Sequence, residues 1–240
     1  MKKNLLILSI VVLLLVCIIL GSFLFFGNEK LSHRLTKHKS GVSIEHAKID
    51  SLEFVADSLF YETERMKVII QTLDETGYYL VIDTKAKVFQ LRKNNIVIRE
   101  GPCAVGKGYT SAGNRSWNFQ TPTGERKIVS KNENPTWFRP TWYWQEKGKS
   151  VPKDFITFSP NMPEEERKEA FRIMSKDEKD YVRAVPGELG RYSLGLGDGY
   201  YIHYGKGLGQ AVSHGCVRVG ADDLEAIYKV LQIGDPVFIY

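Results

Sequence analysis

The sequence predicts a mainly β (α+β) domain with short helices, preceded by an N-terminal transmembrane helix and a helical stalk. Three patterns predict this order: an uncharged apolar run near the N-terminus, apolar residues at helical spacing after it, and short alternating segments separated by turn residues in the C-terminal region. We therefore expect an anchor over residues 1–27, a stalk over residues 28–76 and a folded domain over residues 77–240.

The predicted anchor contains an apolar run, Leu5–Phe26, which is long enough to cross the hydrocarbon core of a bilayer. Lys2 and Lys3 precede it, and the run ends without the small residues that a signal peptidase needs for cleavage. We therefore expect an uncleaved membrane helix rather than a signal sequence. Basic residues flank the run on both sides, so the positive-inside count leaves its orientation open.

The predicted stalk is polar and basic up to about Gly41 and becomes helical after it. Apolar residues recur at intervals of three or four between Leu52 and Leu73, as on one face of a helix. We expect a spacer helix that packs on the domain. A coiled-coil dimerisation segment is the alternative, which so short a heptad pattern does not favour, and the sequence leaves the oligomeric state undetermined.

The folded region begins with residues that alternate between apolar and polar, as strands do. Tyr78–Asp83 and Val88–Leu91 show this alternation on either side of a turn at Thr84–Lys87. Ile96–Arg99 continues the pattern. The domain is therefore expected to begin with antiparallel strands.

The segment of about 132–192 reads as an insertion between two strands of the domain. The aromatic residues near its start are Trp137, Phe138, Trp142, Tyr143 and Trp144. Such residues suit a lid over a binding site and equally suit core packing, and the sequence does not separate these two interpretations. The charged stretch Pro163–Asp180 predicts one or two solvent-facing helices, with Ser175 and Glu178 placed as a capping box.

The composition is that of an ordinary globular protein. Of the 240 residues, 43% are hydrophobic and 25% are charged. The formal net charge of +5 is modest and suits a location near anionic polymers or lipid headgroups. No nucleic acid is needed to explain it.

A thiol and two imidazoles lie close together near the C-terminus, at His203, His214 and Cys216. A cysteine is intrinsically very nucleophilic, and one well-placed imidazole makes it an acyl acceptor. A structural zinc site of the same three residues is the alternative, but the sequence offers no fourth ligand and no cysteine pair nearby. We therefore predict a cysteine nucleophile with a histidine base, and neither a metal nor an organic cofactor.

Gly215 immediately precedes Cys216 and indicates a sharp turn at the nucleophile. We expect a strand-to-helix corner at which the backbone N–H groups of residues 214–216 point at the oxyanion of a tetrahedral intermediate. Asp222 or Asp223 would then cap a helix whose dipole favours the thiolate.

These residues resemble the L,D-transpeptidase family of bacterial cell-wall enzymes, which has the YkuD-type catalytic domain. The family signature is a strand ending in histidine, then Ser-His-Gly-Cys, and an Arg or Asn two residues after the cysteine. Here the matching segments are Tyr201–His203 and Ser213–Arg218. Other segments similar to the family are Thr121–Gly124, Asn134–Trp137 and Pro186–Gly190. The resemblance covers roughly residues 78–240.

One departure from the family pattern concerns the rim of the pocket. Family members usually carry His-Gly-Thr and a longer loop before the serine. Here the strand reads His203-Tyr204-Gly205, and the loop that leads to Ser213 is short.

The resemblance implies a YkuD-like β-sandwich and a transacylation of peptidoglycan stem peptides. Cys216 would attack the carbonyl between the L-centre of a diamino acid and a terminal D-residue, expel the D-amino acid, and hold a thioester until an amine acceptor resolves it. His203 would be the base. Ser213, His214 and Gly215 would orient the nucleophile and stabilise the oxyanion.

The resemblance also assigns the substrate-binding residues and a location. Arg218 would hold a substrate carboxylate, although a surface ion pair is an alternative role, and Tyr204 would contact the substrate. The family's substrate lies outside the cytoplasmic membrane, so we expect a single-pass membrane protein with an extracytoplasmic catalytic domain. Cys103 should then be buried and unpaired, because a disulfide to Cys216 would consume the nucleophile.

Several alternatives stay open from the sequence. An L,D-carboxypeptidase or another cysteine hydrolase would use the same acyl-enzyme but admit water, and a non-catalytic wall-binding scaffold would retain only the fold. A sortase is disfavoured, because the chain lacks the Thr-Leu-x-Thr-Cys context. The acceptor (a second stem peptide, a protein or a free D-amino acid) and the diamino acid of the stem are not determined.

Overall fold

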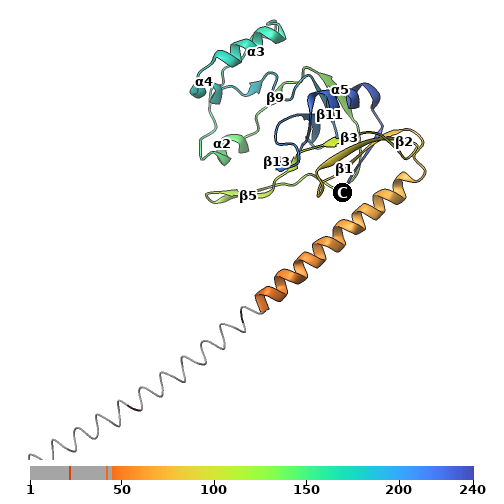
Figure 1. Cartoon of the computed structure of the whole chain (residues 1–240). Coiled ribbons are helices and arrows are strands. Elements are labelled where there is room, and N and C mark those ends of the chain that lie inside the picture. Colours follow the sequence, from red (N-terminus) through yellow and green to blue (C-terminus); the bar gives the residue numbers. More distant parts are fainter. Residues whose placement is uncertain (1–21, 23–41, 43–44) are drawn as a thin grey trace, which may run out of the picture. The chain divides into compact units, whose positions relative to one another are not determined.

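The structure is a computed structural model and describes residues 45–240 together with Ser22 and Val42 (Figure 1). The chain divides into two units, Met1–Phe60 and Tyr61–Tyr240. The predicted membrane-spanning run lies outside the described residues except for Ser22. Among the residues that are described, none belongs to a helix long and apolar enough to cross a membrane.

A helix occupies residues 45–72, in the region where the sequence predicts the spacer helix. In the second unit, Val68 of this helix is buried against Tyr79, Val81 and Phe238. Tyr79 and Val81 alternate along their strand with residues of the main core, so this cluster lies on the outer face of the sheet. The predicted packing of the helix on the domain is confirmed at Val68.

Within the described residues, the larger sheet has the strand order β3-β2-β1-β15-β7. Its strands are β1 (Tyr78–Asp83), β2 (Val88–Lys93), β3 (Ile96–Pro102), β7 (Gly124–Lys127) and β15 (Pro236–Ile239). The β1–β15 pair is parallel and the other pairs are antiparallel. The first strands and their turn lie where predicted, but β2 continues to Lys93, which pairs with Ile96 and Tyr78, and β3 continues to Pro102, which pairs with Val88.

The smaller sheet of the described region has the strand order β14-β12-β11-β8. Its strands are β8 (Ser130–Glu133), β11 (Tyr192–Gly195), β12 (Tyr201–Tyr204) and β14 (Val217–Val219). The β12–β14 pair is parallel, whereas β11 is antiparallel to both of its neighbours. This sheet carries His203, and Cys216 directly precedes its edge strand β14.

Three short strand pairs and four short helices complete the description. The pairs are β4 (Val105–Gly106) with β13 (Ala211–Ser213), β5 (Gly108–Ala112) with β6 (Arg115–Phe119), and β9 (Trp137–Phe138) with β10 (Ala184–Val185). The short helices are α2 (Trp142–Glu146), α3 (Glu164–Ile173), α4 (Lys176–Asp180) and α5 (Ala221–Val230). The fold is therefore mainly β with short helices, as predicted.

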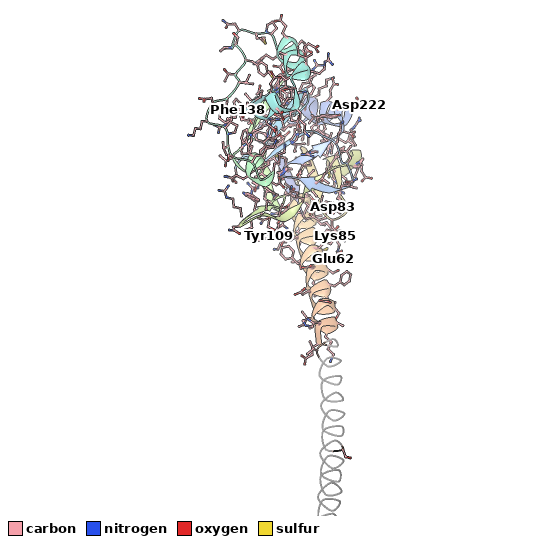
Figure 2. The ribbon with its side chains drawn as sticks, turned by 90° about the vertical axis from the view of Figure 1, so that its left-hand side faces the viewer. Glu62, Asp83, Lys85, Tyr109, Phe138 and Asp222 are labelled. Atoms are coloured by element: carbon pink, nitrogen blue, oxygen red, sulfur yellow. The ribbon has the colours of Figure 1, made fainter. Side chains whose placement is uncertain are left out.

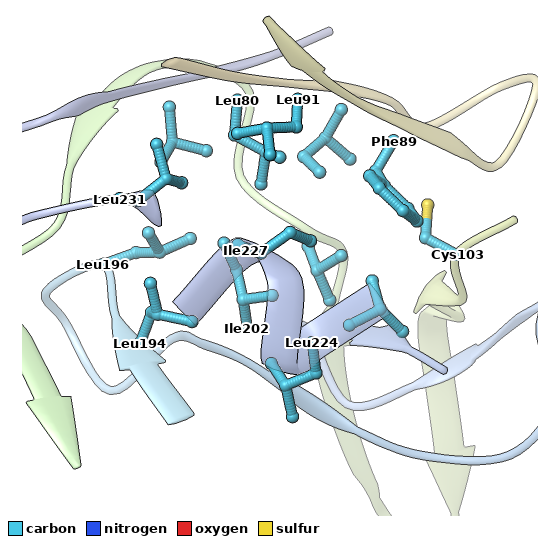
Figure 3. Close-up of a cluster of buried hydrophobic side chains, with 14 of the residues drawn as sticks. Leu80, Phe89, Leu91, Cys103, Leu194, Leu196, Ile202, Leu224, Ile227 and Leu231 are labelled. Atoms are coloured by element: carbon cyan, nitrogen blue, oxygen red, sulfur yellow. The ribbon is translucent and has the colours of Figure 1, made fainter. Parts of the chain in front are cut away.

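The main core brings together the inner faces of both sheets and one face of α5 (Figure 3). Its labelled side chains are Leu80, Phe89, Leu91, Cys103, Leu194, Leu196, Ile202, Leu224, Ile227 and Leu231. Because Ile202 of β12 and Val217 of β14 point into this core, the residues that follow them, His203 and Arg218, lie on the opposite face of these strands.

Helix α5 begins earlier than the sequence predicts. Its N-cap is Gly220, and no side chain caps it. Asp222 and Asp223 lie in the first turn instead, where Asp223 accepts a hydrogen bond from Arg99 Nε at 2.7 Å. The prediction of an aspartate cap is therefore wrong, although both carboxylates still suit the positive end of the helix dipole.

The insertion leaves β8 and returns in β11, its antiparallel neighbour. The predicted capping box of Ser175 and Glu178 is confirmed at the start of α4. Trp144 is 1% exposed, and its indole N–H donates to the backbone oxygen of Asp180 at 2.8 Å, whereas Phe138 is exposed on the surface (Figure 2). The aromatic residues therefore do not share one role, because Trp144 forms the core of the insertion and Phe138 does not.

Cys103 is fully buried beside Phe89 (Figure 3). Burial raises the pKa of its thiol to about 12. Cys103 and Cys216 are both free, so the prediction that Cys103 is buried and unpaired is confirmed within the part of the chain that the structure describes. Cys103 lies between β3 and β4 rather than inside a strand.

Candidate active site

His203 lies in β12 of the smaller sheet, and Cys216 directly precedes β14, the parallel neighbour of β12. In the β12–β14 register, Ile202 lies opposite Val217 and His203 lies opposite Arg218. Ile202 and Val217 point into the core, so alternation directs His203 and Arg218 to the other face. Cys216 directly precedes Val217, so the same alternation places Cys216 on the side of the sheet that carries His203 and Arg218. The sheet therefore brings together the predicted nucleophile, base and cation.

The turn that carries the nucleophile joins two strands. β13 ends at Ser213, β14 begins at Val217, and α5 follows only after β14. The predicted strand-to-helix corner is therefore wrong, because Cys216 leads into an edge strand that pairs with β12. The sharp turn itself is confirmed: Gly215 has φ +108°, and a Cβ there would lie 2.6 Å from Cε1 of Tyr200.

Two hydroxyl groups hold this turn. The Ser213 Oγ accepts from the Gly215 N–H at 3.1 Å and donates to the Cys216 carbonyl at 2.5 Å. The Thr121 Oγ1 donates to the Gly215 carbonyl at 3.0 Å and accepts from the Gly106 N–H at 2.8 Å. One of the three N–H groups expected at the oxyanion, that of Gly215, is therefore already bonded to Ser213.

His203 is only 6% exposed, and its Nδ1 lies 2.6 Å from the Tyr204 carbonyl oxygen. A carbonyl only accepts hydrogen bonds, so Nδ1 carries the hydrogen and Nε2 of the neutral ring is unprotonated. Burial lowers the pKa of His203 to about 4, against the Tyr204 hydrogen bond, and the charge of Arg218 lowers it further. The ring is therefore a neutral base near neutral pH.

The thiol of Cys216 is half-buried. Burial raises its pKa above the usual cysteine value, while a hydrogen bond from the Tyr201 backbone and the charge of Arg218 act in the opposite direction. The raised pKa does not agree with the thiolate expected from a helix dipole. At neutral pH the two side chains are therefore a neutral thiol and a neutral imidazole.

The two predicted substrate-binding residues lie on different faces of the sheet. The stem of Arg218 lies over Gly205, where an added Cβ would approach its Cδ to 2.3 Å. No carboxylate of the described residues forms an ion pair with Arg218. Tyr204 alternates with His203 and packs against the core, so the structure does not bring Tyr204 together with Cys216.

His214 lies among residues that the sequence did not connect with it. Its Nε2 is 2.8 Å from Oε2 of Glu146, and its ring stacks on Trp142 at 4.1 Å between centroids. Phe119 approaches the ring edge-on at 4.6 Å, and Lys107 pairs with the other oxygen of Glu146. The i,i+4 spacing of Trp142 and Glu146 indicates that they share one helix face. No pattern in the sequence predicts that this face contacts His214.

The described residues hold no group of three or more His, Cys, Asp or Glu side chains arranged to bind a metal ion. The arrangement that is present, a half-buried thiol and a buried imidazole with a cation near them, is suited to acyl transfer through a thioester.

A family model of the L,D-transpeptidase catalytic domain (YkuD) matches residues 77–239. The chain therefore belongs to the YkuD family of L,D-transpeptidase catalytic domains. No curated protein sequence matches the chain.

The solved structures that are similar to the chain are distant from it in sequence. The L,D-transpeptidase from Xylanimonas cellulosilytica is 17% identical, with a TM-score of 0.45, over 70% of this chain and 62% of that one. An L,D-transpeptidase from Mycobacterium smegmatis is 16% identical, with a TM-score of 0.42, over 68% and 58% of the two chains. L,D-transpeptidase 1 of Mycobacterium tuberculosis is 18% identical, with a TM-score of 0.40, over 68% and 61%. The chain thus spans about three fifths of the length of these structures.

Proposed function

We propose that the chain is a peptidoglycan L,D-transpeptidase in which Cys216 is the nucleophile and His203 the base. The observation that carries this proposal is that His203 points away from the core on β12, and that Cys216 directly precedes β14, the parallel neighbour of β12. The unprotonated Nε2 that follows from the Tyr204 contact gives His203 the state that a general base needs.

The proposed reaction has two transfers. In the first, Nε2 of His203 takes the thiol proton as Sγ of Cys216 bonds to the substrate carbonyl carbon; the C–N bond then breaks, and the D-amino acid leaves with that proton. In the second, an acceptor amine bonds to the thioester carbon, the C–S bond breaks, and the amine proton returns to Sγ by way of His203. The N–H groups of residues 214 and 216 are the proposed oxyanion donors, since the Gly215 N–H is engaged.

Arg218 is the proposed anchor for a substrate carboxylate. Its guanidinium lies on the sheet face of His203 and is not paired with a carboxylate of the described residues. An arginine can hold a carboxylate through two parallel N–H bonds, which would fix the terminal D-residue beside the thiol. The ion-pair alternative from the sequence finds no partner within this part of the chain.

We also propose that the apolar run Leu5–Phe26 anchors the chain in the cytoplasmic membrane, with the catalytic domain outside. The length of the run and the location of peptidoglycan support this proposal. A topology reporter fused after Tyr240 should be active only outside the cytoplasm. A cytoplasmic signal would overturn the assignment.

The function is tested by mass spectrometry of the full chain incubated with a disaccharide tetrapeptide and an isotopically labelled D-amino acid, beside the Cys216→Ala variant. We expect the label to replace the terminal D-residue with the wild type alone. Accumulation of tripeptide without label would identify a carboxypeptidase. Wall binding that is equal in both proteins, without turnover in either, would identify a scaffold.

A further inference from the structure

The side chain of Glu146 connects the insertion to the turn that carries Cys216. Glu146 is the last residue of α2, and its Oε2 lies 2.8 Å from Nε2 of His214, two residues before the nucleophile. Trp142, one helical turn earlier on α2, stacks on the same imidazole with an interplanar angle of 19°. One short helix therefore contacts His214 both at a ring nitrogen and across a ring face.

The two oxygens of Glu146 serve two different donors. Lys107, just before β5, pairs with Oε1, and His214 uses Oε2. A carboxylate only accepts hydrogen bonds, so Nε2 of His214 carries a hydrogen and Nδ1 is the unprotonated nitrogen of the neutral ring. Glutamine has only one side-chain oxygen and carries no charge, so it would present an NH₂ group in place of one of the two acceptor oxygens. A carboxylate therefore suits this pair of donors better than an amide does.

Three charged groups face the His214 ring from the elements around it: Glu146 from α2, Lys107 from the β4–β5 junction, and Arg218 from β14. Burial lowers the pKa of His214, the hydrogen bond and charge of Glu146 raise it, and the charges of Lys107 and Arg218 lower it. The pKa of Glu146 itself is lowered, because the hydrogen bonds from Lys107 and His214 outweigh the effect of burial. The carboxylate is therefore ionised at neutral pH.

We infer that Glu146 is a positioning residue of the active site, which fixes the ring orientation and the proton state of His214 and thereby the geometry of the turn before Cys216. The insertion is then part of the catalytic apparatus rather than a peripheral addition. The consequence for transfer rests on the proposed function, whereas the state of the His214 ring does not depend on it.

The test compares Glu146→Gln with Lys107→Met in the full chain. Glu146→Gln removes the negative charge and one acceptor, so the pKa of His214 should fall further. Lys107→Met keeps the apolar stem beside Phe119 but removes a positive charge, so the pKa of His214 should rise. Lys149→Met is the matched control, because Lys149 pairs with Asp180 inside the insertion and not with the turn.

The first measurement is an NMR titration of labelled histidine, with the His214 signal assigned by its absence in His214→Gln. Shifts of opposite sign in the two variants, with no shift in Lys149→Met, would support the inference. Opposite shifts would show that Glu146 and Lys107 both act on the proton state of the ring, while the rate of label exchange tests whether Glu146 also positions the turn. Unchanged values in both variants would overturn it.

The second measurement is the pH profile of label exchange. We expect the profile to move with the pKa of His214, and Glu146→Gln to lose about tenfold in rate at pH 7 through misplacement of the turn. Profiles identical to wild type would overturn the inference for the reaction. A wild type that exchanges no label would refute the proposed function, and the NMR titration would then decide the inference about His214 alone.

Discussion

His203 and His214 are two imidazoles of one site, but different regions of the molecule define their states. The ring partner of His203 is the carbonyl of the next residue, Tyr204, within its own strand. The ring partner of His214 is a carboxylate 68 positions away, on the insertion. The contact of His203 lies within a single strand, whereas the contact of His214 requires α2 to pack against the turn before Cys216.

The state of His203 therefore depends on the sheet, whereas the state of His214 also depends on the insertion. Burial and the local backbone determine the proton state of His203. Charges from three separate elements act on His214. We therefore expect substitutions in the insertion to alter the pKa of His214 without altering that of His203.

The largest expected effect follows from removing the nucleophile. Cys216→Ala should lower the rate of label exchange by at least about 10³-fold and should abolish the thioester adduct in intact-mass spectra. Cys103→Ala is the control, since Cys103 is buried in the core and free. Exchange that survives in Cys216→Ala would remove the thiol from the mechanism.

The two histidines should differ in their contribution to rate. His203→Gln removes the general base and should cost about 10²–10⁴-fold, whereas His214→Gln removes an orienting group and should cost about tenfold. Single-turnover formation of the thioester measures both. Equal losses in the two variants would contradict the proposal that His203 is the base and that His214 only orients the nucleophile.

The buried neutral state of His203 should make the fold sensitive to acid. The folded pKa of about 4 lies below the usual value of 6.5, so the unfolded chain binds the proton first and stability is lost as pH falls between these values. The loss is about 3 kcal/mol at pH 4. Chemical denaturation of wild type and His203→Gln from pH 7 to 4 measures it, and parallel curves would contradict it.

The turn before the nucleophile should tolerate no side chain at Gly215. Gly215→Ala meets both a positive φ and the ring of Tyr200, and we expect it to lower the free energy of unfolding by about 2 kcal/mol. Gly209→Ala is the matched control, with φ +79° and open space around the added Cβ. If both variants lose the same stability, the contact with Tyr200 contributes nothing.

Much of the fold could be predicted because its signals are local. Alternation located β1 and its turn, helical spacing located the stalk helix, and the Ser175–Glu178 pair marked the start of α4. The ends of β2 and β3 were placed too early, because cross-strand hydrogen bonds extended them beyond the alternating residues. The predicted cap of α5 was placed too late in the sequence. Asp223 lies in the first turn of the helix, where it pairs with Arg99 of another strand.

The candidate nucleophile, base and turn could be recognised from the sequence, because Cys216, His203 and Gly215 lie in one short stretch and their reactivity and backbone freedom are properties of the residues themselves. Three features became visible only in the folded chain: Tyr204 faces the core, a strand follows Cys216, and Glu146, Lys107 and Trp142 surround His214. Burial and ion pairing depend on which distant segments come into contact, and the spacing of residues along the chain does not encode those contacts.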